Sequence, residues 1–111
     1  MSNCNNQDNE KHISIKVQEK YDHHLNFFGG TGHDWYIKSV NDIEYEHTTT
    51  LNNDELIIES NLVKTNLVGG NKTRIFTITP LTNNNFVIVF EKIRLWDKVG
   101  TIHTLNITIT N

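Results

Sequence analysis

The chain has 111 residues, the size of one domain, and its 10 basic and 13 acidic side chains give a net charge of −3. It has no cluster of lysines and arginines that could follow a phosphate backbone, and no apolar run near the roughly 20 residues of a membrane span. Neither nucleic acid nor a membrane is therefore an expected partner. A helical bundle is excluded too, because alanine is absent while Ile, Thr and Val supply 33 residues.

The first eleven residues are polar and show no apolar periodicity. We therefore expect a disordered tail over residues 1–11 and a single folded domain over residues 12–111. The one cysteine, Cys4, lies in this Asn-rich tail and can form neither an internal disulfide nor a metal site with several cysteines. Because the N-terminus is not apolar, we expect the cytoplasm if the chain is complete, and lysosomes or secretory vesicles if a leader was removed.

Apolar and polar residues alternate from His12 onward. Residues 12–17 place Ile13 and Ile15 on one face, and residues 20–25 do the same with His23 and Leu25. Further short strands are expected at residues 35–40, 43–47, 56–63, 73–79, 86–93 and 102–110, of which 86–93 has apolar residues on both faces, as in a central strand. This spacing, with no helical crossover, predicts an all-β fold, an immunoglobulin-like antiparallel β-sandwich of seven to eight strands.

The six glycines all lie in three connectors between these strands. If the strands are lettered A to G and residues 43–47 are counted as an extra ribbon, the connectors are B–C, D–E and F–G. They hold Gly29, Gly30 and Gly32; Gly69 and Gly70; and Gly100, respectively. Every second connection of an up-and-down antiparallel sandwich emerges at the same end, so the three loops should share one rim. Glycines can simply form turns, but three such loops on a rigid scaffold indicate a binding edge.

Histidines near the first of these connectors do not form a convincing metal site. His33 precedes Asp34, and zinc takes imidazole and carboxylate ligands. His23 and His24, however, are adjacent on a strand and must face opposite ways, and no third ligand is evident. The chain also contains no nucleophile elbow and no phosphate-binding loop of the Walker type. We therefore expect a protein that is not an enzyme and needs neither a metal nor a cofactor.

The two tryptophans have different surroundings in the sequence. Trp35 begins a strand and shares a face with Ile37, which favours packing between the sheets. Trp96 lies among charged residues in a connector, where burial in the protein's own core is harder to arrange. An interface role for Trp96 and simple packing within a turn are both open, since tryptophan often dominates protein interfaces.

At these connectors the chain resembles the chagasin family of immunoglobulin-like inhibitors of papain-type (clan CA) cysteine proteases. The family's first loop, Asn-Pro-Thr-Thr-Gly followed by a strand with Trp, corresponds to residues 28–35, in which Thr31, Gly32 and Trp35 are kept. Its Gly-x-Gly-Gly loop corresponds to residues 67–70 and its Arg-Pro-Trp to residues 94–96, where the first Gly and the Pro are missing. The order and spacing hold from about Val17 to the C-terminus.

The resemblance implies a reversible, tight-binding, monomeric inhibitor that occludes the cleft of papain-like proteases of the cathepsin L and B type. Thr31 and Gly32 would lie over the catalytic Cys/His pair, Gly69 and Gly70 along the cleft wall, and Arg94 and Trp96 on an outer surface, with Arg94 able to pair with a carboxylate. The expected protease-binding residues are Phe28, Gly29, Gly30, Thr31, Gly32, His33, Gly69, Gly70, Arg94, Leu95 and Trp96.

The first loop departs from the family pattern, because Phe28-Gly29-Gly30 stands where the family has Asn-Pro-Thr. Loss of the proline ring and gain of two glycines could change the rigidity of the loop and its protease preference. Phe28 could pack on the base of the loop or on the enzyme. The alternative function is an adhesion or carbohydrate-binding module without inhibitory activity, and a third is a structural partner domain, since sandwiches host many functions.

Overall fold

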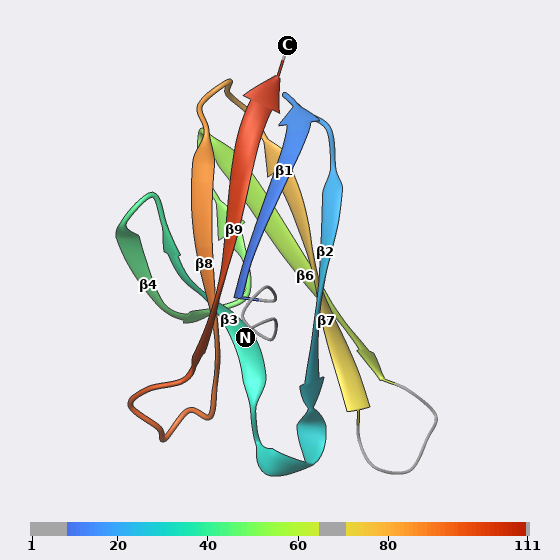
Figure 1. The fold of residues 1–111 in the computed structure, drawn as a ribbon, viewed down its shortest axis with the longest axis vertical. Coiled ribbons are helices and arrows are strands. Elements are labelled where there is room, and N and C mark those ends of the chain that lie inside the picture. Colours follow the sequence, from blue (N-terminus) through green and yellow to red (C-terminus); the bar gives the residue numbers. More distant parts are fainter. Residues whose placement is uncertain (1–8, 65–70, 111) are drawn as a thin grey trace, which may run out of the picture.

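A computed structural model describes residues 9–64 and 71–110 of the chain. Nine strands form two facing sheets (Figure 1), with the orders β1-β9-β8-β3-β4 and β2-β7-β6-β5. The strands are β1 (Glu10–Lys16), β2 (Tyr21–Phe28), β3 (Asp34–Val40), β4 (Ile43–Thr48), β5 (Leu51–Asn52), β6 (Leu56–Lys64), β7 (Asn71–Pro80), β8 (Phe86–Ile93) and β9 (Thr101–Thr110). The predicted all-β, immunoglobulin-like sandwich is confirmed, and the strand that the sequence pattern did not indicate is the two-residue β5.

The first strand departs from the expected arrangement in direction and in length. β1 pairs with β9 in parallel, whereas the other paired strands among the described residues are antiparallel. The parallel register begins at Glu10 opposite Thr104, two residues before the strand that was expected over residues 12–17. Backbone pairing with β9 holds these two polar residues in the strand although they bury no apolar surface. The rest of the predicted tail, residues 1–8, lies outside the described residues.

The turn between β1 and β2 contains neither glycine nor proline. Gln18 adopts a φ of 69°, in the left-handed region, and its N–H donates to the carbonyl oxygen of Pro80 at 2.7 Å. The side chain of Glu19 accepts a hydrogen bond from the backbone N–H of Lys16 at 2.9 Å. These bonds to neighbouring strands stabilise a turn conformation that most residues other than glycine resist.

The core lies between the two sheets and is built from alternate residues of every long strand. Phe86, Ile88 and Phe90 of β8 are fully buried, while Val87 on the opposite face is exposed, so only one face of this central strand is fully covered. Phe90 meets Phe76 of β7 across the core with ring centroids 4.6 Å apart. Burial of each such ring stabilises the fold by about 2–3 kcal/mol, which makes the sandwich a firm support for its connecting loops.

Among the residues that the structure describes, no helix is both long enough and apolar enough to cross a membrane.

Candidate functional site

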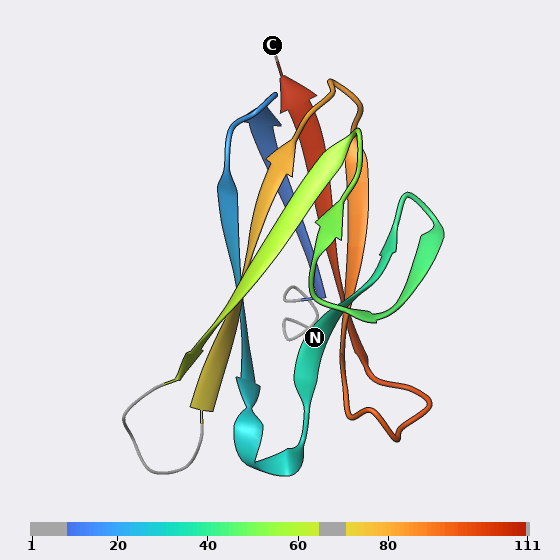
Figure 2. The same ribbon diagram turned by 180° about the vertical axis from the view of Figure 1, so that it is seen from behind.

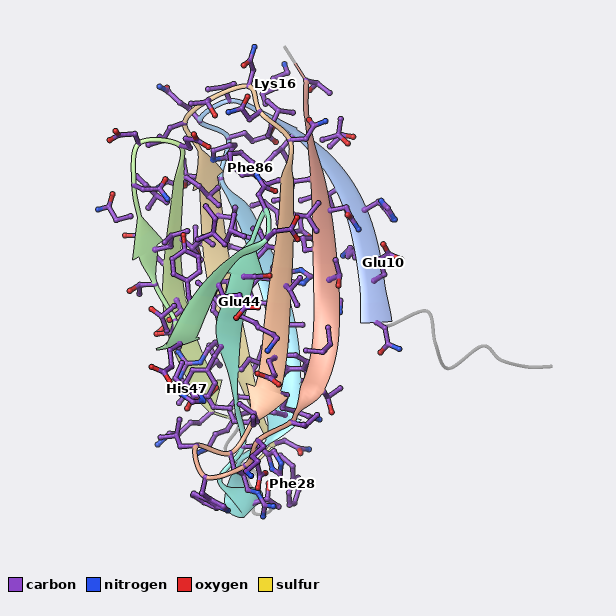
Figure 3. The ribbon with its side chains drawn as sticks, turned by 90° about the vertical axis from the view of Figure 1, so that its left-hand side faces the viewer. Glu10, Lys16, Phe28, Glu44, His47 and Phe86 are labelled. Atoms are coloured by element: carbon purple, nitrogen blue, oxygen red, sulfur yellow. The ribbon has the colours of Figure 1, made fainter. Side chains whose placement is uncertain are left out.

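The first and third of the glycine-containing connectors emerge at the same end of the sandwich. β3 starts where β8 ends, with Asp34 paired to Ile93, and β9 starts opposite Lys92. Residues 29–33 and 94–100 therefore lie together, at the lower end in Figures 1 and 2. Phe28 lies at this end, opposite the end that holds Lys16 and Phe86 (Figure 3). We call residues 28–33 the first loop, residues 94–100 the third loop, and both together the rim.

The second of the three predicted loops is framed by described residues but not itself described. β6 ends at Lys64, which pairs with Lys72, and β7 begins at Asn71, which pairs with Phe28. The strands that frame this connector therefore end at the same end of the sandwich as the rim. Gly69 and Gly70 lie outside the described residues.

The first loop is closed by its own hydrogen bonds. Residues Gly29–Thr31 form a single 3-10 turn, which ends at Gly32 with a φ of 85°. The hydroxyl of Thr31 donates to the carbonyl oxygen of Phe28 at 3.0 Å and lies 2.6 Å from Nδ1 of His33. Because that hydroxyl has only one proton, Nδ1 of His33 is the donor in the second bond. Thr31 thereby ties both sides of the loop together in a segment that lacks the family's proline.

Two polar contacts beneath the first loop hold its ends in place. Nε1 of Trp35 donates to the carbonyl oxygen of Asn26 at 2.9 Å, which connects the strands on either side of the loop. Asp34 accepts two hydrogen bonds of 2.8 Å from Arg74, in the facing sheet, and one of 2.7 Å from the backbone N–H of Trp35. Trp35 is buried, so its predicted core role is confirmed. Sequence reasoning missed Arg74, because its partner is 40 residues away along the chain.

The third loop is braced by an ion pair between its own residues. Nε and Nη2 of Arg94 donate to the carboxylate of Asp97 at 2.7 and 3.1 Å. These hydrogen bonds lower the pKa of Asp97 and raise that of Arg94. The sequence indicated that Arg94 can pair with a carboxylate. In the structure its guanidinium is paired with Asp97 of the same loop, and it lies 5.4 Å from the ring centroid of Trp96.

Large apolar side chains are exposed on the rim. Of the eight such side chains that are exposed in the described part of the chain, four belong to it, namely Phe28 at 52 %, Leu95 at 58 %, Trp96 at 70 % and Val99 at 81 %. Apolar surface gathered in this way is typical of protein interaction sites. Val99 was not among the predicted site residues. The sequence feature that could have indicated it is the position of an aliphatic residue in a connector, between Lys98 and Gly100.

The two loops of the rim touch each other at Gly32. A Cβ atom placed on this glycine would lie 2.9 Å from Cη2 of Trp96, 3.5 Å from Cζ2 of the same ring and 3.8 Å from Cδ of Arg94. The edge of the Trp96 ring therefore rests on the backbone of the first loop. The structure thus brings together the predicted residues of the first and third loops, from Phe28 to His33 and from Arg94 to Trp96.

A second polar feature lies away from the rim, between the two sheets. His23 faces the core and His24 faces solvent, which confirms the prediction that these two side chains face opposite ways. Nε2 of His23 lies 2.9 Å from Nε2 of the buried His103 on β9, so one ring donates and the other accepts. Burial, and then the neighbouring His103, lower the pKa of His23 to about 3. The pair lines a cleft of about 850 Å³ together with Trp35 and Lys92.

This pair lacks the further ligands of a metal centre. Within residues 9–64 and 71–110, no group of three or more His, Cys, Asp or Glu side chains is placed to hold a metal ion. Asp34, the carboxylate that follows His33, is occupied by Arg74. Sequence reasoning did not anticipate His103 as the partner of His23, since the two are 80 residues apart.

Known structures share this fold, although no protein-family model and no curated protein matches the chain by sequence. PbICP-C, solved in complex with falcipain-2, is 20 % identical with a TM-score of 0.69, over 99 % of this chain and 96 % of the other. The cysteine protease inhibitor EhICP2 from Entamoeba histolytica is 17 % identical with a TM-score of 0.65, over 96 % and 91 %. Amebosin, solved in solution, is 18 % identical with a TM-score of 0.67, over 93 % and 91 %. The chain thus shares its fold with these three proteins, as its resemblance to the chagasin family implied.

Proposed function

We propose that this chain is a reversible inhibitor of papain-like cysteine proteases of the cathepsin L and B type, and that the rim occludes their active-site cleft. The observation that carries the proposal is the rim itself, in which two mutually packed loops expose apolar side chains at one end of a rigid sandwich. The sharing of this fold with EhICP2, a cysteine protease inhibitor, and with PbICP-C, crystallised with falcipain-2, supports it.

The rim has the properties that occlusion requires. Thr31 and Gly32 are small, so the backbone of the first loop can approach a recessed catalytic thiol closely. Leu95 and Val99 offer apolar surface beside it. Protease inhibitors usually bury about 1,600 Å² in total at the interface, and such an interface binds tightly when little conformational entropy is lost on binding. The hydrogen bonds of Thr31 reduce this loss, because they already order the first loop in the free protein.

Gly69 and Gly70 belong to the same proposal as a third contact. The strands that frame them, β6 and β7, meet the rim end of the sandwich at Lys64 and Asn71. The proposal assigns to Gly69 and Gly70 the contact along the cleft wall of the protease. The inhibitor acts as a monomer in this proposal, and it meets its protease wherever the two share a compartment.

Inhibition of papain and cathepsin L, measured with a fluorogenic peptide substrate, tests the proposal. The wild-type protein should inhibit at submicromolar concentration and reversibly on dilution. Leu95→Ser should raise the inhibition constant about tenfold, because it removes an exposed apolar contact from the rim. Ile43→Ser is the matched control, since Ile43 is similarly exposed, at 62 %, but lies on β4 next to Val40, far along β8 from the rim. Absence of inhibition at micromolar concentration would refute the proposal.

A further inference from the structure

We infer that Trp96 is a positioning residue, whose ring holds the first loop in its observed conformation so that the two loops of the rim form one preassembled body. Its importance for inhibition rests on the proposed function, but the packing itself belongs to the free protein. This role differs from that of a side chain that only contacts a partner.

The contact depends on glycine at position 32 for two separate reasons. The φ of 85° lies in the left-handed region that other residues resist. The space that a Cβ atom would occupy is also taken, by Cη2 of Trp96 at 2.9 Å. Real Cβ atoms essentially never come that close to another heavy atom. Backbone conformation and ring packing are therefore matched at this one position.

Within the third loop, Asp97 holds Arg94, and Arg94 in turn contacts the ring of Trp96. Asp97 binds Arg94 through two hydrogen bonds, and the Arg94 guanidinium lies 5.4 Å from the centroid of Trp96. Cδ of Arg94 also reaches to 3.8 Å from the Cβ position of Gly32. The backbone N–H of Asp97 donates to the carbonyl oxygen of Arg94 at 3.0 Å, which closes the turn that carries the ring. Trp96 is therefore held by contacts within its own loop as well as by its contact with the first loop.

Exposure shows that this packing does little for the core. Trp96 is 70 % exposed, whereas tryptophans that pack in a protein core are largely buried. The ring edge that carries Cη2 and Cζ2 lies against Gly32. The contact therefore orders the first loop, which otherwise depends on the bonds of Thr31, and in an inhibitor that order reduces the entropy lost on binding.

Backbone order in the free protein tests the inference directly. Nitrogen-15 order parameters of residues 30–33 should be near those of a rigid backbone, about 0.85, in the wild type, and should fall below about 0.6 in Trp96→Ala. Val99→Ala is the control on the same loop, because Val99 is 81 % exposed and is not among the atoms nearest Gly32. It should leave these values unchanged. Low values in the wild type, or values that Trp96→Ala does not change, would overturn the inference.

A pair of variants tests the contact through inhibition. Gly32→Ala should weaken inhibition at least tenfold in the wild type and by a clearly smaller factor in the Trp96→Ala background, because removal of the ring relieves the clash but not the backbone strain. Equal factors in both backgrounds would contradict packing of the ring on Gly32. If even the wild type fails to inhibit, the proposed function is wrong, and the order parameters of the free protein still decide the positioning role.

Discussion

Protonation of His23, which is buried between the sheets, should destabilise the protein at acidic pH. The pKa of His23 falls from 6.5 to about 3 in the folded protein, chiefly because its burial disfavours the charged ring and secondly because of His103, with smaller contributions from Lys11 and His24. Between these two values the unfolded chain binds a proton that the folded chain does not. Stability contributed by the neutral ring is therefore complete above pH 6.5 and is lost as the pH falls towards 3.

The size of this effect follows from the pKa difference. Each pH unit within the window changes the free energy of unfolding by up to about 1.4 kcal/mol, so the loss from pH 7 to pH 5 is roughly 2 kcal/mol. For a domain of this length, that corresponds to a fall in Tm on the order of 10 °C. Such a loss is a large share of the stability of a small domain.

Urea unfolding at several pH values, in the wild type and in His23→Gln, measures this contribution. The amide of glutamine can form a hydrogen bond with His103 but does not titrate in this pH range. The difference in unfolding free energy between the two proteins should change by roughly 2 kcal/mol between pH 7 and pH 5. His12→Gln, at a solvent-exposed ring on β1, is the control for replacement of a histidine outside the core. A constant difference between wild type and His23→Gln would refute the reasoning.

Two further substitutions test the supports of the rim. Asp34→Ala leaves the guanidinium of Arg74, which is only 13 % exposed, without its carboxylate, and should lower the free energy of unfolding by about 3 kcal/mol. A urea midpoint that stays at the wild-type value would show that this ion pair is not a support. Gly100→Ala would place a Cβ atom 2.8 Å from that of the buried Ile93, and should destabilise by about 2 kcal/mol. Unchanged thermal unfolding of Gly100→Ala, with Val99→Ala as the neutral control, would argue against that close packing.

Local pattern was enough to predict most strands and the end of the sandwich that carries the first and third loops. Alternation located the core faces of β2 and β8, since burial of one face requires a period of two residues. The shared end of the loops followed from the parity of antiparallel connections alone. β5 was not predicted, because two residues are too few to show the alternation of apolar and polar residues. The early start of β1 was not predicted either, because its first residues are held by backbone pairing rather than by apolar burial.

Contacts between distant segments could not be predicted, for a different reason. The approach of His103 to His23, of Arg74 to Asp34 and of Trp96 to Gly32 depends on how strands and loops face one another in space. No periodicity within one segment encodes such partners. Gly32 illustrates this limit. Both Gly32 and Trp96 are visible in the sequence, but the contact between them is not.

Protection of the catalytic thiol of a papain-like protease tests the central claim most directly. Papain would be treated with iodoacetamide in the presence of increasing amounts of this protein, and the rate of thiol alkylation would be followed. If the rim occludes the cleft, the rate should fall in proportion to the fraction of papain bound, reach near zero at one equivalent, and recover on dilution. Alkylation at the uninhibited rate in the presence of a stoichiometric excess would contradict the account.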